Sequence, residues 1–134
     1  MDLLDDKVRG FLEERRFAVL ATINGDGTPQ QSTMWYELRG DRIMMNTAVG
    51  RLKEKNLRRD PRISLCIEDE YDYVALKGVI ELDYDHDRSQ ADIKALAVRY
   101  EDEETGERMA RNTFRKQARV TIYMTVEKVD AHFE

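Results

Sequence analysis

A glycine followed by closely spaced basic residues is the part of this chain whose residue types suggest chemistry. The segment 46–56 places Gly50, Arg51 and Lys53 where strand-like sequence gives way to helix-like sequence. A helix N-terminus presents unpaired backbone N–H groups and a partial positive charge, so it is suited to binding phosphate. Arg51 and Lys53 would add charge-assisted hydrogen bonds, and Asn56 a neutral donor about one turn later. The segment predicts a phosphate site without a Walker sequence.

The distribution of charge sets this segment apart from the rest of the chain. The formal net charge is −5, yet residues 51–62 hold six basic and two acidic residues, a local +4. An acidic protein with one basic island is a poor candidate for nucleic-acid binding, and the island has no aromatic residue on which a base could stack. The plain alternative is a solvated helix face that balances an acidic protein.

Hydrophobic periodicity predicts the elements that position the segment. Helices are expected over 2–16, 51–59, 86–100 and 106–115, with Pro61 ending the second. Strands are expected over 17–23, 29–38, 42–47, 63–68 and 73–83, with a last strand starting near Val120. The turn Asn24-Gly25-Asp26-Gly27 makes the first two strands antiparallel neighbours. The apolar parity of the last strand changes after Val126, which predicts a β-bulge near Glu127 or Lys128.

These elements predict a mainly β fold in one domain over 1–134: a six-stranded antiparallel barrel, closed, with short peripheral helices. No apolar run approaches the roughly 18 residues that span a bilayer, and the first residues are acidic, so a cytoplasmic protein without membrane contact is expected. Cys66 lies in the apolar run 63–67 and is expected to be a buried structural thiol.

Three blocks of sequence resemble a known family. They are 18–22 with Gly27-Thr28-Pro29-Gln30, then 50–53 with 56–62, and finally 73–78. In this order and spacing the chain resembles the pyridoxamine 5'-phosphate oxidase-like split β-barrel superfamily, and in particular its F420-dependent oxidoreductase branch, of the FDOR-B type. The second block is the most specific of the three.

The resemblance implies a homodimer with a flavin-type cofactor in a groove at the subunit interface. The cofactor implied is the deazaflavin coenzyme F420, with FMN as the alternative. The residues implied to bind it fall into three groups: those beside the ring (Ser32, Thr33, Met34, Trp35, Met45, Asn46 and Thr47), those on the phosphate (Arg51, Lys53 and Asn56), and those supplied by the second subunit (Tyr73 and Lys77). Arg15, Arg16, Lys55 and Arg58 are candidates for the acidic tail of F420.

The resemblance also implies an activity: hydride transfer from the reduced deazaflavin to a small, conjugated, electron-poor acceptor. Such chemistry needs no catalytic side chain, since the cofactor is the hydride donor, and neither His86 nor His132 sits in an acid–base constellation. His86 and its acidic neighbours do not have the spacing of a metal site. The alternatives are an FMN-dependent flavoprotein of the same fold and a protein that binds flavin or F420 without catalysis. Pyridoxamine phosphate oxidation itself is disfavoured, because the C-terminal substrate motif is absent after Tyr123.

Overall fold

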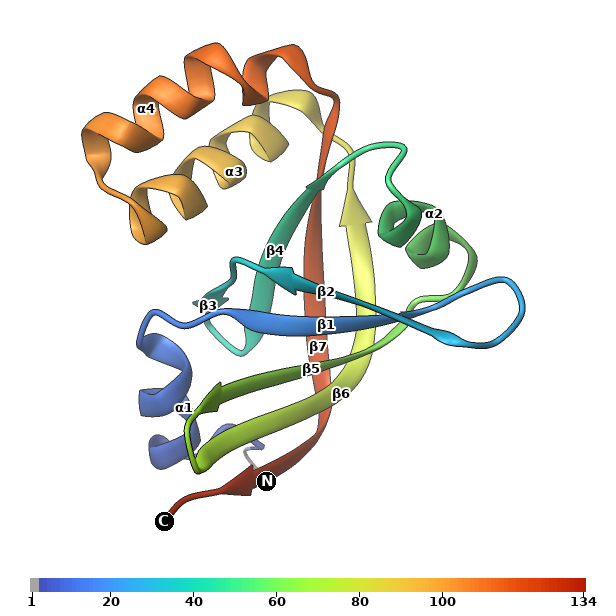
Figure 1. Ribbon diagram of the computed structural model, residues 1–134, viewed down its shortest axis with the longest axis vertical. Helices are drawn as coiled ribbons and strands as arrows, with labels where there is room; N and C mark the ends of the chain where they lie inside the picture. Colours follow the sequence, from blue (N-terminus) through green and yellow to red (C-terminus); the bar gives the residue numbers. More distant parts are fainter. Residues whose placement is uncertain (1–2) are drawn as a thin grey trace.

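The structure is a computed structural model that describes residues 3–134, and it consists of a twisted β-sheet with helices at its two ends (Figure 1). Its elements in chain order are α1 (Asp6–Glu13), β1 (Ala18–Ile23), β2 (Pro29–Met34), β3 (Glu37–Arg39), β4 (Arg42–Ala48), α2 (Leu52–Arg59), β5 (Arg62–Asp69), β6 (Asp72–Asp83), α3 (His86–Tyr100), α4 (Glu103–Asn112), the 3-10 turn η1 (Phe114–Lys116) and β7 (Arg119–His132).

All neighbouring strands are antiparallel, in the order β2-β1-β5-β6-β7-β4-β3. The mainly β split-barrel fold is therefore confirmed, including the pairing of β1 with β2 across the predicted turn. The sheet has seven strands, however, and its hydrogen bonding does not close into a barrel.

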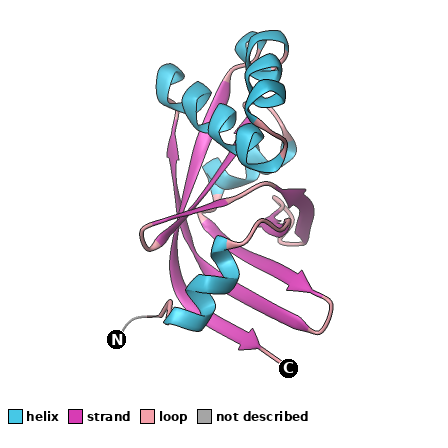
Figure 2. Ribbon diagram, turned by 90° about the vertical axis from the view of Figure 1, so that its left-hand side faces the viewer, coloured by secondary structure: helices cyan, strands magenta, loops and turns pink. Residues whose placement is uncertain are grey.

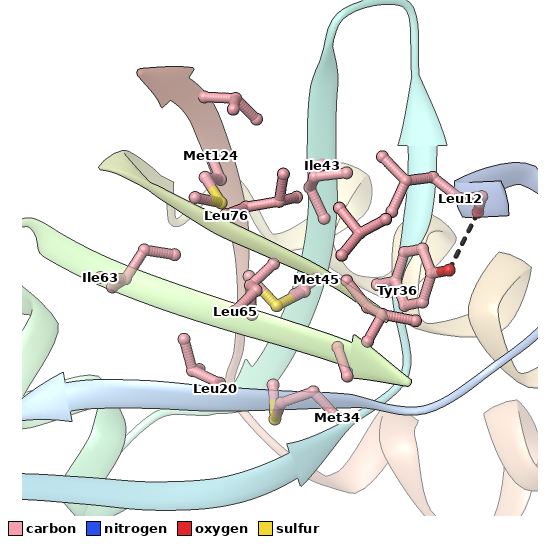
Figure 3. Packing of buried hydrophobic residues seen from close by; sticks show 14 of the residues in the cluster. Leu12, Leu20, Met34, Tyr36, Ile43, Met45, Ile63, Leu65, Leu76 and Met124 are labelled. Carbon is pink, nitrogen blue, oxygen red and sulfur yellow. Dashed lines mark hydrogen bonds between the residues drawn. The ribbon is translucent and has the colours of Figure 1, made fainter. Parts of the chain in front are cut away.

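The prediction of one continuous strand over 29–38 is wrong. Trp35 and Tyr36 interrupt it, so that β2 pairs with β1 at one edge of the sheet and β3 with β4 at the other. Tyr36 is fully buried; its hydroxyl donates to the Leu12 carbonyl at 2.9 Å (Figure 3), and its N–H donates to the Tyr100 hydroxyl at 3.1 Å. Because the Tyr100 hydroxyl replaces a strand partner here, the N–H of the buried Tyr36 stays paired where the chain crosses between the two edges.

The helices differ from prediction mainly at their ends. The predicted helix 86–100 is confirmed as α3, whereas α1 is shorter than expected: Asp5 caps it by accepting from the Val8 N–H at 2.9 Å, and Glu14 is already extended. The predicted start at Asp2 lies outside the described residues. Helix α4 begins at Glu103, earlier than predicted, because Asp102 caps it. Figure 2 shows α3 and α4 together at one end of the sheet and α1 at the other.

Two hydrophobic clusters hold these layers together. The larger lies inside the curved sheet and contains Met34, Tyr36 and Met45 together with α1 residues (Figure 3). The smaller joins Met44 of β4 to α3 and to Phe114. Successive residues of β4 thus face opposite ways, as strand geometry requires.

The prediction for Cys66 is wrong, because its side chain is exposed. Its neighbours Leu65 and Ile67 are buried, so the strand alternates and the thiol falls on the outer face. An apolar run in this strand therefore does not mean burial on both faces.

The predicted β-bulge is confirmed. Lys77 pairs with Lys128 and Gly78 pairs with Val126, which leaves Glu127 as the extra residue. Gly78 lies at this shift, where a Cβ atom would fall 2.0 Å from the Thr125 carbonyl oxygen. Only glycine lets the two backbones approach this closely.

We expect Gly78→Ala to lower the free energy of unfolding by about 1–3 kcal/mol, since the clash is with backbone that has little room to move. Gly10→Ala is the matched control, because a Cβ there meets nothing within 4 Å in helix α1. That substitution should leave stability unchanged or raise it by up to about 1 kcal/mol. Urea unfolding of both variants measures the difference, and equal effects would contradict the close approach.

Candidate functional site

A pocket of about 240 Å³ lies where the end of β2, the strand β4 and the start of α2 meet the α3–α4 helices. Its wall is formed by Thr33, Met34, Trp35, Asn46, Arg51, Lys53, Ile93, Leu96, Met109, Phe114 and Arg119. Six of these were predicted as site residues: Thr33, Met34, Trp35, Asn46, Arg51 and Lys53. The structure therefore brings half of the predicted set into one cavity.

Local backbone geometry places the first two cations of this pocket. Gly50 has a φ of +98°, a conformation that glycine adopts freely, and it turns the chain from β4 into α2. Arg51 is the N-cap residue of α2, and Lys53 lies in the first turn. The Lys53 ammonium contacts the Met34 thioether sulfur at 3.3 Å. The structure thus contains the predicted combination of a glycine turn, a helix N-terminus and two basic residues.

A third cation, Arg119, lines the same pocket from the first residue of β7 and was missed by the sequence analysis. Its side chain is 7% exposed. Its Nε donates to the Asn46 amide oxygen at 2.9 Å, its Nη1 donates to the Gln117 amide oxygen at 2.6 Å, and the guanidinium lies 5.0 Å from the centre of the Phe114 ring. A lone arginine ahead of an apolar strand was the only hint in the sequence, and it does not reveal the neighbour across the sheet.

The three cations have no acidic partner. Within residues 3–134, none of Arg51, Lys53 and Arg119 forms an ion pair, and no carboxylate lines the pocket. Burial lowers the pKa of Lys53, and the charges of Arg51 and Arg119 lower it further. Burial, followed by the charge of Arg51, lowers the pKa of Arg119 to about 10. An anion in the pocket would relieve this repulsion.

Glu54 fixes the turn that carries Arg51 and Lys53. This glutamate is fully buried and accepts from the Gly50 N–H at 2.9 Å, the Tyr84 hydroxyl at 2.7 Å and the Arg58 Nε at 2.7 Å. Burial alone would raise the pKa of Glu54, but these hydrogen bonds and the charge of Arg58 bring it below its ordinary value. Because Glu54 accepts from the Gly50 N–H, it ties the first turn of α2 to the glycine turn before it, and it is not part of the pocket wall.

The remaining wall of the pocket is apolar and comes largely from the helices after β6. Ile93 and Leu96 of α3, Met109 of α4 and Phe114 line it, and Trp35 packs against the cluster to which they belong. Trp35 stacks on Tyr100 with ring centres 5.3 Å apart and planes at 12°. These helices were predicted as peripheral elements, whereas the structure makes them one side of the site.

The other predicted site residues lie elsewhere. Met45 is fully buried in the sheet core. The Asn56 amide donates to Thr22 Oγ1 at 3.1 Å and to Asn24 Oδ1 at 2.9 Å, so Asn56 ties α2 to the β1–β2 turn away from the pocket. Ser32 and Thr47 do not line the pocket, but each has a buried hydroxyl oxygen without a hydrogen-bond partner among the described residues.

Tyr73 and Lys77 also lie away from the pocket. Both are on β6, and Lys77 borders a separate depression of about 390 Å³ next to Thr22, Pro29 and Arg62. Their predicted role as residues supplied by a second subunit therefore stays a prediction.

Of the bases considered for an acidic tail, three have partners within the chain. Arg15 donates to the Tyr100 carbonyl at 2.8 Å, Arg16 pairs with Glu14 and Asp69, and Arg58 pairs with Glu54. Lys55 is exposed. Residues 3–134 contain no group of three or more His, Cys, Asp or Glu side chains placed to hold a metal ion. In the same part of the chain, no helix is both long and apolar enough to cross a bilayer.

The role of Glu54 predicts a specific pH dependence. Its pKa is lower in the folded protein than the ordinary 4.5, so its stabilising contribution is complete above that value and is lost as the pH falls through the folded pKa. Wild type should therefore be more stable than Glu54→Gln at pH 7, with the gap narrowing below pH 4.5. Urea unfolding from pH 7 to pH 3 measures it. Glu81→Gln, at a side chain that is 82% exposed, serves as the control. If the difference in unfolding free energy between wild type and Glu54→Gln does not change with pH, Glu54 does not have this role.

Known proteins share the fold of this chain. The family model for pyridoxamine 5'-phosphate oxidase matches residues 4–133. Among solved structures, the chain is similar to the conserved hypothetical protein Rv2991 from Mycobacterium tuberculosis, with a TM-score of 0.81 and 26% identity over 95% of this chain and 82% of that one. An F420 reductase gives a TM-score of 0.73 at 24% identity, covering 91% of this chain and 94% of its own. A putative pyridoxamine 5'-phosphate oxidase from Listeria innocua gives 0.68 at 19%, covering 96% and 97%.

The last two matches show a shared fold. The family model, in contrast, spans nearly the whole chain. The protein therefore belongs to the pyridoxamine 5'-phosphate oxidase family of split-barrel proteins, which bind flavins or related cofactors.

Proposed function

We propose that this protein is a homodimeric F420-dependent oxidoreductase that reduces a small, conjugated, electron-poor acceptor. The observation that carries the proposal is the pocket at the start of α2, where Arg51, Lys53 and Arg119 meet without a carboxylate. Three cationic side chains repel one another when they lie close together, and a bound phosphate offsets that repulsion. In a family that binds flavin-type cofactors, the natural occupant is the cofactor's phosphate.

The residues beside the pocket fit such a cofactor. Ser32 on β2 and Thr47 on β4 hold the only buried side-chain oxygen or nitrogen atoms within residues 3–134 that lack a hydrogen-bond partner. Buried hydroxyls are normally paired, so two unpaired ones on strands next to the cationic pocket support a polar ligand along these strands. Both residues were implied by the family resemblance to lie beside the ring.

The activity follows from what these residues can do. A reduced deazaflavin, when bound, supplies a hydride to the acceptor. The cations and the α2 N-terminus hold the phosphate, and Trp35, Met109 and Phe114 exclude water from one side.

F420 is favoured over FMN by the sequence blocks around 50–62 and by the similarity in fold to an F420 reductase. FMN remains the second candidate, because the matching family model is that of pyridoxamine 5'-phosphate oxidase. Either cofactor would place a phosphate on the same cations.

The test is a titration of the purified protein with F420 and with FMN, side by side, following the quenching of cofactor fluorescence. We expect tight F420 binding and weak FMN binding, and then reduction of conjugated acceptors by reduced F420. Tight binding of FMN alone would make this an FMN protein, binding without turnover would make it a carrier, and binding of neither cofactor would refute the proposal.

The dimer is proposed from the outer face of the sheet. Register places Val19, Cys66 and Ala75 in one row across β1, β5 and β6, and Ala21, Ser64 and Lys77 in the next. Val19 is 37% exposed and Cys66 is also exposed, so small and apolar side chains face outward here. Such a face suits a flat contact with a second copy, which would carry Tyr73 and Lys77 toward the partner's pocket.

Mixed dimers test whether Lys77 completes the site of the other subunit. Lys53→Ala should weaken F420 binding by about 1.5–3 kcal/mol, the worth of a hydrogen bond to a charged group, and Lys77→Ala should weaken it as well. In a dimer with one Lys53→Ala chain and one Lys77→Ala chain, one site regains both lysines and should bind as in wild type.

The control for the mixed dimer pairs Lys53→Ala with Arg51→Ala. Both changes lie in the pocket itself, so neither site is restored. If the Lys53→Ala and Lys77→Ala mixture shows no tight sites, Lys77 does not act across the interface.

A further inference from the structure

We propose that Arg119 is a third anion-binding residue, which holds the cofactor's phosphate from the start of β7 and makes the pocket selective for ligands with more than one negative charge. This inference rests on the proposed function and extends it, because neither the family blocks nor the spacing of the basic island includes Arg119. It assigns a residue of β7 to a site otherwise built from β2, β4 and α2.

The first support is the state of the Arg119 side chain. A buried arginine is normally paired with a carboxylate, since burying an isolated charge is costly. Arg119 is 7% exposed and its contacts are two neutral amide oxygens and one aromatic ring. Its charge is therefore held in place without being neutralised.

The second support is its unused hydrogen-bonding capacity. Nε donates to Asn46 and Nη1 donates to Gln117, whereas Nη2 has no acceptor among the described residues. Because Arg119 lines the pocket, the N–H groups of Nη2 are available to a ligand there. A planar guanidinium fixed at two nitrogens can donate to a phosphate oxygen with little further loss of side-chain freedom.

The third support is the way the guanidinium is oriented. Asn46 accepts from Arg119 through its amide oxygen and donates through its nitrogen to the Ser89 carbonyl at 3.0 Å and to Thr121 Oγ1 at 3.3 Å. Asn46 thus links β4, α3 and β7, and it acts as a positioning residue for Arg119. Its predicted place beside the cofactor ring stays a prediction.

The charge of the pocket sets the ligand class. With three cations and no carboxylate, a single negative charge leaves most of the repulsion in place, while a phosphate monoester, or a phosphodiester with a carboxylate close by, neutralises more of it. FMN meets the first description and F420 the second.

The experiment compares two deazaflavins: F420, and the deazaflavin alcohol that lacks the phosphate and everything beyond it. Arg119→Gln should weaken F420 binding by about tenfold or more, as expected for loss of a charged hydrogen bond, and should leave the affinity for the alcohol unchanged. Arg119→Lys keeps the charge and should recover part of the loss. Arg115→Gln is the matched control, since Arg115 is exposed and lies outside this pocket.

Two results would overturn the assignment. In one, Arg119→Gln binds F420 as wild type does. In the other, it loses affinity for F420 and the alcohol equally, which would make the arginine purely structural.

A second measurement separates this inference from the proposed function and does not need the cofactor. Pyrophosphate should raise the melting temperature of wild type and of Arg115→Gln above that in chloride of equal ionic strength. Most of that rise should disappear in Arg119→Gln. If pyrophosphate raises the melting temperature of wild type but neither F420 nor FMN binds, the proposed function is refuted and the anion site is kept. If the melting temperature of wild type does not rise, or rises equally in Arg119→Gln, Arg119 is not part of an anion site.

Discussion

The pairing of β4 with β7 is the constraint on which the site depends. Asn46 lies opposite Thr121 and Ala48 opposite Arg119, and beyond the last pair the Val49 N–H donates to the Ala118 carbonyl at 2.8 Å. This register brings the start of β7 to the turn that carries Arg51 and Lys53. A slip of one residue would turn Arg119 to the other face of the sheet and Val120 into the pocket.

The cationic pocket therefore lowers the stability of the fold when no anion is bound. Burial and mutual repulsion lower the pKa of both Lys53 and Arg119. Glu54 accepts from the Gly50 N–H and does not line the pocket. Asn46 and Gln117 bind Arg119 through neutral amide oxygens, so the positive charge of the pocket is not neutralised by an acidic side chain. If the protein bound no anion here, replacing one of the three cations would make it more stable. A role in balancing surface charge therefore does not explain why the three cations lie together.

The features that could be predicted from the sequence are those determined by residues close together in the chain. Gly50, Arg51 and Lys53 are nearly consecutive, so the turn, the helix start and its charges could be inferred together, and the parity change after Val126 located the bulge. The break at Trp35–Tyr36 could not be inferred, because it depends on buried partners at Leu12 and Tyr100.

Other features of the site depend on contacts between distant segments. Arg119 and the helical wall belong to segments that reach the pocket only through tertiary pairing. Asn56 has the right spacing for a phosphate donor, yet Thr22 and Asn24 engage its amide. The exposure of Cys66, in contrast, could have been inferred from the alternation of Ile63, Leu65 and Ile67.

A crystal structure of the protein with F420 bound tests the cationic pocket most directly. We expect the phosphate oxygens to lie within hydrogen-bonding distance of the Arg51, Lys53 and Arg119 side chains at the start of α2, with the ring along β2 and β4. A phosphate bound instead beside Asn56, or in the depression next to Lys77 of the same chain, would contradict this expectation.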